Sequence, residues 1–390
     1  MTELLEAATR IGPVISQYID EEENSRRLSK PVLGELREAG FHMLYLPKSL
    51  GGLEADPVTT AEMVEEVARH NTAAGWSMMV ANTSTWWSSR LPEKGIEEIY
   101  ENGPDTLIAG AFHPPMMAVR VKGGYRINGR SPLTSNVHEA KWIFVTALVC
   151  DQQGQLKMND GIPEVIGVYL NPEHCEIIDT WFTLGMKATD SNDIIAKDVF
   201  VPDHLFFFLA PEFQPNSYYT GPLYQFAAMG ASIACLIAPV ALALARNAIH
   251  ELKVLAEKKT SFGATVPLRE RGSIQRKLGL AEAHVQSSRA YLYHTISESW
   301  SKTLAGQKLS LEEKAGLLLA AAHTNQSCLN AVDLMYSAAG SSAIYTRNKL
   351  AHYFSDAQVI RQHGFANESR YETAAQVYFG LQPDLPVLAF

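Results

Sequence analysis

The sequence predicts an α+β protein, mainly helical, in which a domain of strands lies between two helical domains. Three observations support this class. Apolar residues recur at helical spacing over the first part of the chain. Short segments rich in β-branched and aromatic residues follow, separated by Gly, Asn, Asp and Pro. Helical spacing then returns and continues to the end. We expect an N-terminal helical domain over 1–104, a central β-barrel-like domain over 105–207 and a C-terminal four-helix bundle over 208–390.

Composition and charge indicate a folded globular protein. Of the 390 residues, 46% are hydrophobic and 19% are charged, which is far from a disordered composition. The net charge is −9, and the 33 basic residues are spread along the chain without a Lys/Arg block, so we expect no nucleic-acid partner. The start of the chain lacks the basic-then-apolar order of a signal peptide, so we expect a cytoplasmic protein.

The four cysteines show no pattern of a metal site. Cys150, Cys175, Cys235 and Cys328 are widely separated and match no metal-ligand spacing. We expect reduced, buried thiols and no bound metal.

The N-terminal domain contains clear helix boundaries. In "SKPVLGELREAGF", Ser29 is a candidate N-cap and Gly40 ends the helical pattern. Two more helices are expected on either side of Asn71, in "PVTTAEMVEEVARHNTAAGWSMMVANTSTWWSSRL". The first domain is therefore expected to contain at least three helices.

The central domain is predicted from five segments of strand composition. They are "TLIAGAF", "AVRVKGGYRINGR", "WIFVTALV", "EVIGVYL" and "DIIAKDVFVP". Each is short and is bounded by turn-forming residues, as expected for a sheet joined by tight connections.

The C-terminal part is predicted to form long packed helices. Six small or apolar residues recur at steps of four and three, which predicts a seam that packs against another helix. They are Ile274, Leu278, Ala281, Val285, Ser288 and Leu292. A second long helix is expected to end at Gly340.

One apolar run allows two interpretations. The segment from Phe226 to Ala245 has no charge and is long enough to cross a membrane. It is rich in alanine, contains Pro239 and lacks an aromatic or basic collar at both ends. We favour a buried helix in a bundle and expect no membrane partner, with a membrane span as the alternative.

Four motifs, in order along the chain, resemble those of the acyl-CoA dehydrogenase superfamily. They are "LREAGFHMLYLPKSLGG", "GGYRINGRSPLTSNVHEAKWIFVTALV", "TWFTLGMKATDSNDIIAKDVFVP" and "KKTSFGATVPLRERGSIQRKLGLAEA". The resemblance covers nearly the whole chain. It implies the acyl-CoA dehydrogenase fold.

Two enzyme branches of this superfamily are possible. A dehydrogenase needs a carboxylate base, which many members place in a Tyr-Glu-Gly motif after an Arg-Asp pair. Here the corresponding residues are Ser355-Asp356 and then Gln362-His363-Gly364, so the carboxylate is missing. Some dehydrogenases take the base from an earlier helix, so this branch stays open. The two-component flavin monooxygenases tend to carry a histidine at this place, and this is the branch that we favour.

The resemblance implies an oxygenase component that uses reduced FAD or FMN and O2. Through a C4a-hydroperoxide it would oxygenate a small aromatic substrate, for which an indole-like ring is the first candidate. His363 would be a catalytic residue, because an imidazole with a pKa near ~6.5 can take or return a proton at neutral pH. The alternative is a structural histidine that caps a helix.

The resemblance also implies roles for other residues. The Ser135 hydroxyl would bond the N5 edge of the flavin and act in catalysis, and His113 would orient the substrate. Asn136, Trp142, Lys259 and Phe262 would contribute to cofactor binding. The alternative for each of them is a purely structural role, in a turn, in the core or at the surface.

The departures from the dehydrogenase pattern bear on partners. Lys259 stands where dehydrogenases have an Arg that reaches the flavin pyrophosphate, which suits an enzyme that borrows reduced flavin and releases it. No GxGxxG fingerprint opens a βαβ unit, so we expect a separate NAD(P)H-dependent flavin reductase. Relatives form dimers of dimers that share flavin sites, and we therefore expect a homotetramer. The remaining alternative is a non-catalytic helical assembly protein that has kept the fold.

Overall fold

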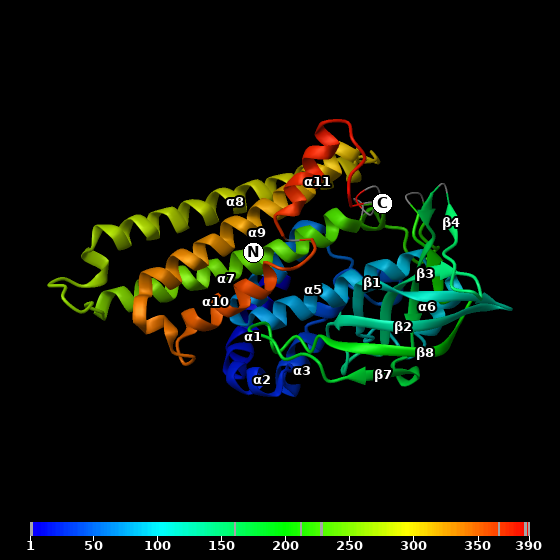
Figure 1. Cartoon of the computed structure of the whole chain (residues 1–390), viewed down its shortest axis with the longest axis horizontal. Helices are drawn as coiled ribbons and strands as arrows, with labels where there is room; N and C mark the ends of the chain where they lie inside the picture. The colour runs from blue at the N-terminus through cyan, green and yellow to red at the C-terminus, as the bar shows by residue number, and fades with distance from the viewer. Residues whose placement is uncertain are drawn as a thin grey trace.

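The computed structural model shows the expected order of helices, strands and helices. It describes residues 3–159, 161–210, 213–226, 229–365, 367–385 and 388, without the side chains of 113, 114 and 229–234. In the described chain all strands lie between Ile108 and Phe208, with helices before and after them (Figure 1). The predicted fold class is confirmed.

The N-terminal part consists of helices whose boundaries follow local capping. Ser29 caps the third helix by accepting a hydrogen bond from the Val32 N–H, and Gly40 follows that helix at φ 70°. Asn71 separates the fourth and fifth helices, and its side chain accepts from the N–H groups of Ala73 and Ala74. The bounds are α1 Glu3–Gln17, α2 Ile19–Ser25, α3 Lys30–Glu38, α4 Pro57–His70, α5 Thr72–Trp87 and α6 Glu93–Ile99, with short 3-10 turns at Phe41–Met43, Lys48–Leu50 and Ser88–Arg90.

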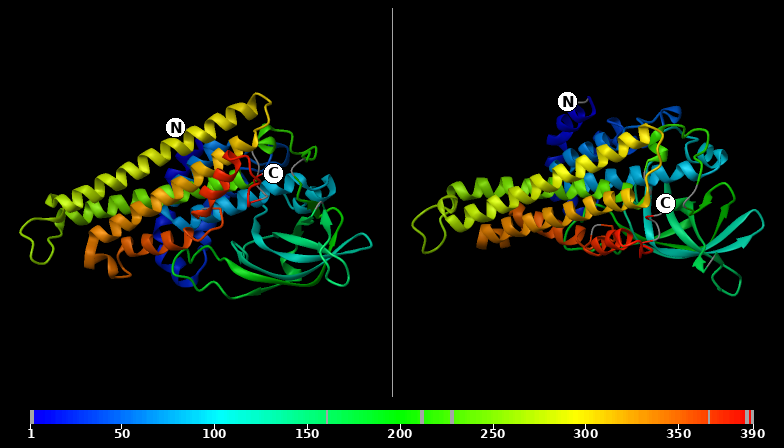
Figure 2. Two further views of the ribbon diagram at one scale, coloured as in Figure 1. Left: turned by 45° about the horizontal axis from the view of Figure 1, so that its top comes forward. Right: turned by 90° about the horizontal axis from the view of Figure 1, so that it is seen from above.

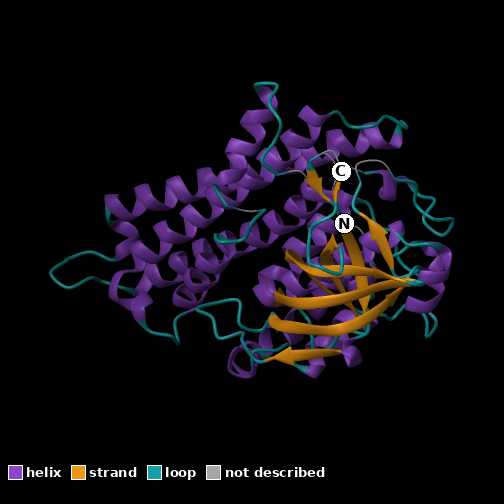
Figure 3. Cartoon of the chain, turned by 45° about the vertical axis from the view of Figure 1, so that its right-hand side comes forward, coloured by secondary structure: helices purple, strands orange, loops and turns teal. Residues whose placement is uncertain are grey.

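The central part is a seven-stranded mixed sheet and a separate two-stranded hairpin. The strand order is β7-β8-β2-β1-β3-β6-β9, and β1 and β3 are parallel. The sheet has two edges, β7 and β9, so in detail the barrel-like domain is an open sheet (Figure 3). The bounds are β1 Ile108–Val121, β2 Gly124–Thr134, β3 Trp142–Cys150, β4 Met158–Asn159, β5 Ile162–Pro163, β6 Val165–Leu170, β7 Cys175–Ile178, β8 Asn192–Pro202 and β9 Phe206–Phe208.

The C-terminal part is a bundle of long helices. The predicted seam is buried on the second of them at Ile274, Ala281, Val285, Ser288 and Leu292, where it packs against the third. The third helix ends at Gly340 as predicted. The bounds are α7 Met229–Lys258, α8 Gly272–Leu304, α9 Leu311–Ala339, α10 Lys349–Ile360 and α11 Ser369–Tyr378, with 3-10 turns at Pro172–His174, Pro222–Gln225, Leu268–Glu270 and Gly340–Ile344.

The apolar run forms part of α7, a core helix of the bundle. In the described chain α7 is the one helix long and apolar enough to cross a membrane. Its side chains from Cys235 to Ala245 are buried against the rest of the protein. The expectation of a buried helix is therefore confirmed.

Helix α5 connects the bundle to the sheet and positions the site. It is buried on nearly all sides and contacts α4, α7 and β1. Figure 1 shows it lying between the long helices and the strands. Side chains of one face of α5 can therefore border a space that the sheet and the bundle also enclose.

Candidate active site

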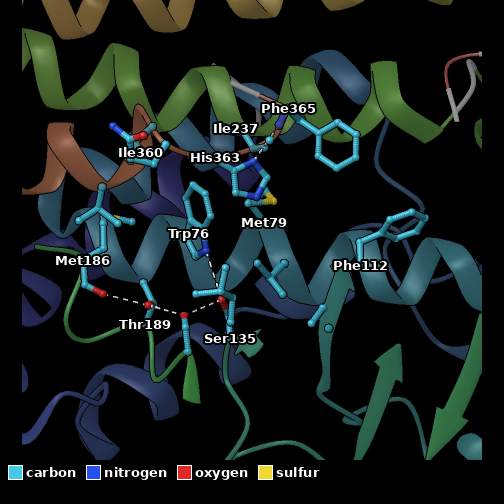
Figure 4. Close-up of a pocket in the computed structure, with 18 of the residues that line it drawn as sticks. Trp76, Met79, Phe112, Ser135, Met186, Thr189, Ile237, Ile360, His363 and Phe365 are labelled. Carbon is cyan, nitrogen blue, oxygen red and sulfur yellow. Dashed lines mark hydrogen bonds between the residues drawn. The ribbon is translucent and has the colours of Figure 1, made fainter. Parts of the chain in front are cut away.

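A cavity of about 590 Å³ lies between α5, the sheet and the end of α10 (Figure 4). Its walls come from α5, from the first half of β1, from the segments that follow β2 and precede β8, and from residues 358–365. Most of the lining is apolar or aromatic. None of the described lining side chains is Asp, Glu, Lys or Arg. The cavity therefore suits a flat, uncharged ring system with a few polar contacts.

His363 lies at the cavity wall, and its tautomer is set by the backbone. The segment after α10 turns so that the Phe365 N–H donates to His363 Nδ1 at 3.3 Å. A backbone N–H can only donate, so Nδ1 carries a lone pair. The neutral ring then holds its proton on Nε2. Edge-on packing against the Trp76 ring, with centroids 5.2 Å apart, fixes the plane of the imidazole.

The surroundings of His363 keep it uncharged. Burial lowers the pKa of His363 from its usual value to about 4, because the charged form loses solvation among apolar and aromatic neighbours. At neutral pH the imidazole is therefore a hydrogen-bond donor through Nε2. This changes the role expected from the sequence, in which a pKa near 6.5 allowed the ring to take a proton.

Five residues form a row of hydrogen bonds along one wall of the cavity. Trp76 Nε1–H donates to Ser135 Oγ at 3.4 Å, and the Oγ atoms of Ser135 and Ser191 are 2.7 Å apart. Ser191 Oγ lies 2.7 Å from Thr189 Oγ1, which donates to the Met186 carbonyl at 2.9 Å. Figure 4 shows these bonds as one row.

The two ends of this row fix its direction. The Met186 carbonyl can only accept and the indole N–H can only donate. Each hydroxyl has one proton, so Thr189 receives a bond from Ser191, and Ser191 receives one from Ser135. Ser135 Oγ is then left with a free lone pair and no free proton. It can accept a further hydrogen bond from a ligand but cannot donate one.

Asn136 holds the turn that presents Ser135. It has a φ of 66°, its Nδ2 donates to the Ser77 carbonyl at 2.9 Å, and its backbone N–H donates to the Thr189 carbonyl. A backbone bridge joins Ser135 to Gly110 of β1. Since the Asn136 amide already has a partner inside the protein, its position favours a supporting role beside the cavity.

Trp142, which was expected to bind the cofactor, and Trp181 differ in their relation to the cavity. Trp181 lines it and is held by a bond from Nε1 to the Met186 carbonyl at 3.1 Å. Trp142 begins β3 opposite Ile108, is half-buried and does not line the cavity. Of the two, only Trp181 is placed to form a wall of the site.

Lys259 and Phe262 lie far from the cavity within one chain. Both follow α7, and roughly 33 Å of helix separates Lys259 from Ile237, which lines the cavity. Figures 1 and 2 show the α7–α8 connection at the end of the bundle away from the sheet. Lys259 Nζ donates to the Ala339 carbonyl and to Ser342 Oγ, at 2.6 and 2.7 Å. Phe262 is fully exposed.

His113 lies in β1, in the stretch where the register with β3 shifts between Ala111 and Met116. Its side chain is outside the described part of the structure. The neighbouring Phe112 lines the cavity, so this part of β1 lies beside the site.

Two acidic side chains and a histidine form a candidate cation site beside Met186, which lines the cavity. One ligand atom from each of Glu23, His352 and Asp356 lies within 4.8 Å of the others. Asp356 already accepts from the Met186 N–H at 2.6 Å, and Lys187 lies 3.4 Å from Glu23. The Met186 segment is therefore fastened to α10 by the hydrogen bond to Asp356, and Glu23 already has a basic partner in Lys187.

The roles of Thr189 and Ser191 were not predicted from the sequence. Both lie in the motif "GMKATDS", so a signal for them was present. Their function as partners of Ser135 depends on contacts between segments more than 50 residues apart, which the sequence pattern does not give.

Comparison with protein families identifies two matching regions. Residues 6–95 match the acyl-CoA dehydrogenase N-terminal domain, and residues 235–368 match the acyl-CoA dehydrogenase C-terminal domain. The indole-3-acetate monooxygenase of Pseudomonas putida is 30% identical, over 97% of this chain and 96% of its own length. HsaA of Mycobacterium tuberculosis, the oxygenase subunit of a flavin-dependent monooxygenase, is 26% identical over 97% of this chain and 96% of its own.

Solved structures share the fold over the whole chain. XiaF from a Streptomyces species, in complex with FADH2 and glycerol, has a TM-score of 0.89 at 23% identity and covers 98% of this chain and 96% of its own. TdsC from Paenibacillus sp. A11-2, in complex with FMN and indole, has a TM-score of 0.78 at 15% identity and covers 100% of both chains. At these identities the likeness shows the fold.

Proposed function

This chain belongs to the acyl-CoA dehydrogenase family and is the oxygenase component of a two-component, flavin-dependent monooxygenase, and we propose that it oxygenates a small, uncharged aromatic ring. An indole-like ring is the first candidate. It would bind in the cavity beside His363, with reduced FAD or FMN along the wall that carries Ser135. The observation that carries this proposal is the chemistry of the cavity lining.

The lining supports oxygenation over dehydrogenation. A dehydrogenase of this fold removes a proton from its substrate with a carboxylate. No carboxylate is found among the described residues that line the cavity, and a neutral imidazole occupies the position expected for the base. The uncharged aromatic walls favour a ring without a charge, because an ionised group here would lose its hydration without gaining a partner.

The wall that carries Ser135 fits reduced flavin. When bound, reduced flavin supplies the two electrons with which O2 is activated. Its N5 carries a hydrogen, whereas N5 of oxidised flavin is a bare acceptor. Ser135 Oγ has a free lone pair and no free proton, so it would hold the reduced form at N5 and disfavour the oxidised form. Trp181 would lie against the ring system.

His363 would act as a fixed donor. Its Nε2–H is not used by the backbone, and the Phe365 N–H and the Trp76 ring hold the imidazole in place. A donor that is already oriented in a largely apolar cavity stabilises negative charge that develops on a nearby oxygen. The same donor could hold a substrate oxygen or nitrogen. His113 is retained as a second candidate for orienting the substrate.

An oxygenase subunit of this kind works with a separate flavin reductase. We propose that the reductase is NAD(P)H-dependent and that flavin passes between the two proteins by release and rebinding. A site that favours reduced flavin at Ser135 supports this exchange, because the oxidised product is held less strongly.

The position of Lys259 and Phe262 supports an oligomer with shared sites, for which we propose a homotetramer. Within one chain they are too far from the cavity to touch the same flavin. Phe262 is fully exposed. Ile344 ends the 3-10 turn Gly340–Ile344 and Tyr345 follows it, and both expose more than half of their surface close to Ser342. In a symmetric assembly these residues could reach the cofactor of a second copy.

The test of the proposed function uses purified protein with chemically reduced FAD or FMN, indole and labelled O2. Incorporation of one labelled oxygen atom into the product is the expected result. Anaerobic reduction of flavin by an acyl-CoA thioester would instead establish the dehydrogenase alternative. No affinity for either form of flavin would leave the assembly protein as the explanation.

A further inference from the structure

We propose that Ser84 binds a ring N–H of the aromatic substrate and so determines which ring systems the enzyme accepts. The inference rests on the proposed function and specifies the substrate class of the same site. It is carried by one unpartnered hydroxyl in the cavity wall.

Ser84 is a buried polar residue whose hydroxyl has no partner among the described residues. It lies on α5, its side chain lines the cavity, and its exposed fraction is 3%. Its backbone carbonyl accepts from Tyr169 Oη, but its Oγ makes no hydrogen bond in the described structure. The neighbouring Thr83 differs, because its Oγ1 donates to the Met79 carbonyl at 3.0 Å. A buried hydroxyl without a partner is costly, so a ligand that satisfies it gains affinity.

The Ser84 hydroxyl opens to the cavity. Other unpartnered hydroxyls, such as those of Ser77 and Ser89, are fully enclosed by protein atoms, and Ser84 is not among them. Trp87 also lines the cavity, but its unpartnered Nε1 is enclosed. Ser84 therefore offers a buried polar atom of the cavity lining that has no partner among the described residues and is reachable.

Gly110 leaves the space in front of this hydroxyl. A Cβ at position 110 would lie 2.3 Å from Ser84 Oγ, closer than any real contact. Gly110 itself lines the cavity, and its backbone is fixed by pairing with Phe144 of β3 and by the bridge to Ser135. The missing side chain thus keeps the hydroxyl uncovered.

The walls around Ser84 are aromatic and flat. Trp87 stacks on Phe144 with centroids 5.6 Å apart and planes 8° apart, and Phe112 lies 5.7 Å from Trp87. Such walls accept the faces of a fused ring, and the described lining residues offer no charged side chain to pair with an anionic group. The hydroxyl can accept from a ring N–H at the edge of that ring.

A second polar point lies at the other end of the cavity. Trp76, which contacts His363, and Ser84 are on the same helix, separated by roughly 12 Å along its axis. A two-ring heteroaromatic with a hydrogen bond at each end spans a comparable length. The substrate would then be oriented by the His363 donor at one end and by Ser84 at the other.

The experiment compares indole with indene, which has the same shape but carries CH2 in place of the N–H. Binding of each probe to the full-length protein loaded with reduced FAD is measured anaerobically by calorimetry. The wild type is expected to bind indole about 10- to 100-fold more tightly than indene, and Ser84→Ala should remove this preference. Ser77→Ala is the matched control, because it deletes an unpartnered hydroxyl of α5 that does not line the cavity.

Two results would overturn the inference: a wild type without a preference for indole, or a Ser84→Ala variant that keeps it. Gly110→Ala gives a second test, because its Cβ covers the hydroxyl and should also remove the preference. Oxygenation of indole with reduced flavin is measured separately in the wild type. If oxygenation occurs while Ser84→Ala keeps the preference, only the role of Ser84 is refuted. If no oxygenation occurs, the proposed function itself fails.

Discussion

Replacing His363 by Gln and by Ala separates two roles of its imidazole. A Gln side chain can place an amide N–H near the position of Nε2, but it cannot take up a proton at any pH used for activity. Ala removes the donor altogether. If His363 acts as a neutral donor, Gln should preserve much of its function. If His363 acts as an acid or base, both variants should fail alike.

The structure sets the size of the expected effects. His363 is held by the Phe365 N–H and lines a largely apolar cavity, so its Nε2–H is a preorganised donor. The loss of one such donor typically lowers the rate by about 10² to 10³. We expect His363→Ala to lose about this factor in product formation and His363→Gln to stay within roughly tenfold of the wild type.

The assay mixes each protein with chemically reduced flavin, O2 and indole, and measures product and hydrogen peroxide together at several pH values between about 6 and 8. The lost product should be replaced by hydrogen peroxide in His363→Ala. His294→Gln is the matched control, because His294 is an exposed histidine on α8. Flavin affinity is measured for each variant, so that a loss of cofactor is not mistaken for a loss of chemistry.

One combination of results would refute this role of His363. If His363→Gln is as inactive as His363→Ala, and wild-type activity rises or falls through a single transition near pH 6.5 that the variants lack, the imidazole carries a proton in the reaction. Its pKa in the loaded enzyme would then have to lie far above about 4.

Three further outcomes follow from the same contacts. The pKa of His363 is about 4 in the folded protein against 6.5 for the free group, so the unfolded chain binds the proton first as the pH falls. The free energy of unfolding of the wild type should therefore drop between pH 6.5 and pH 4 by at most about 3 kcal/mol. Denaturant titration of His363→Gln should show a smaller drop. Ser191→Ala removes the acceptor of the Ser135 proton, so Ser135 becomes free to donate to oxidised flavin. The dissociation constant of oxidised flavin, divided by that of reduced flavin, should therefore fall by about 5- to 10-fold. An unchanged ratio in anaerobic titrations would contradict the proposed direction of the hydrogen bonds. Gly185→Ala places a Cβ 2.4 Å from the Ser355 backbone carbon of α10. The variant should lose about 1–3 kcal/mol of unfolding free energy, and its melting temperature should fall by several degrees. Gly364→Ala is the control, because its Cβ would meet open space, and it should melt close to the wild type.

Much of the fold was predictable because its signals are local. The Ser29 cap, the break at Asn71 and the α8 seam each depend on residues a few positions apart, and all three appear where the sequence placed them. The strands were found because their composition differs sharply from that of the helices on either side. The sequence did not predict that the sheet is open, because the order of the strands depends on pairings such as β8 with β2 that join distant segments.

By itself, the sequence determined the fold, the family and the presence of a histidine where a carboxylate would otherwise stand. Tertiary structure decided what that histidine can do: the Phe365 N–H and the aromatic neighbours fix the proton on Nε2 and lower the pKa of the ring. It also decided the direction of the hydrogen bonds between Ser135, Ser191 and Thr189, and it left the Ser84 hydroxyl without a partner among the described residues. These properties depend on which donors and acceptors meet across α5, the sheet and the segment after α10. Hydrogen-bond direction and desolvation arise only when such segments pack together, so no local pattern in the sequence contains them.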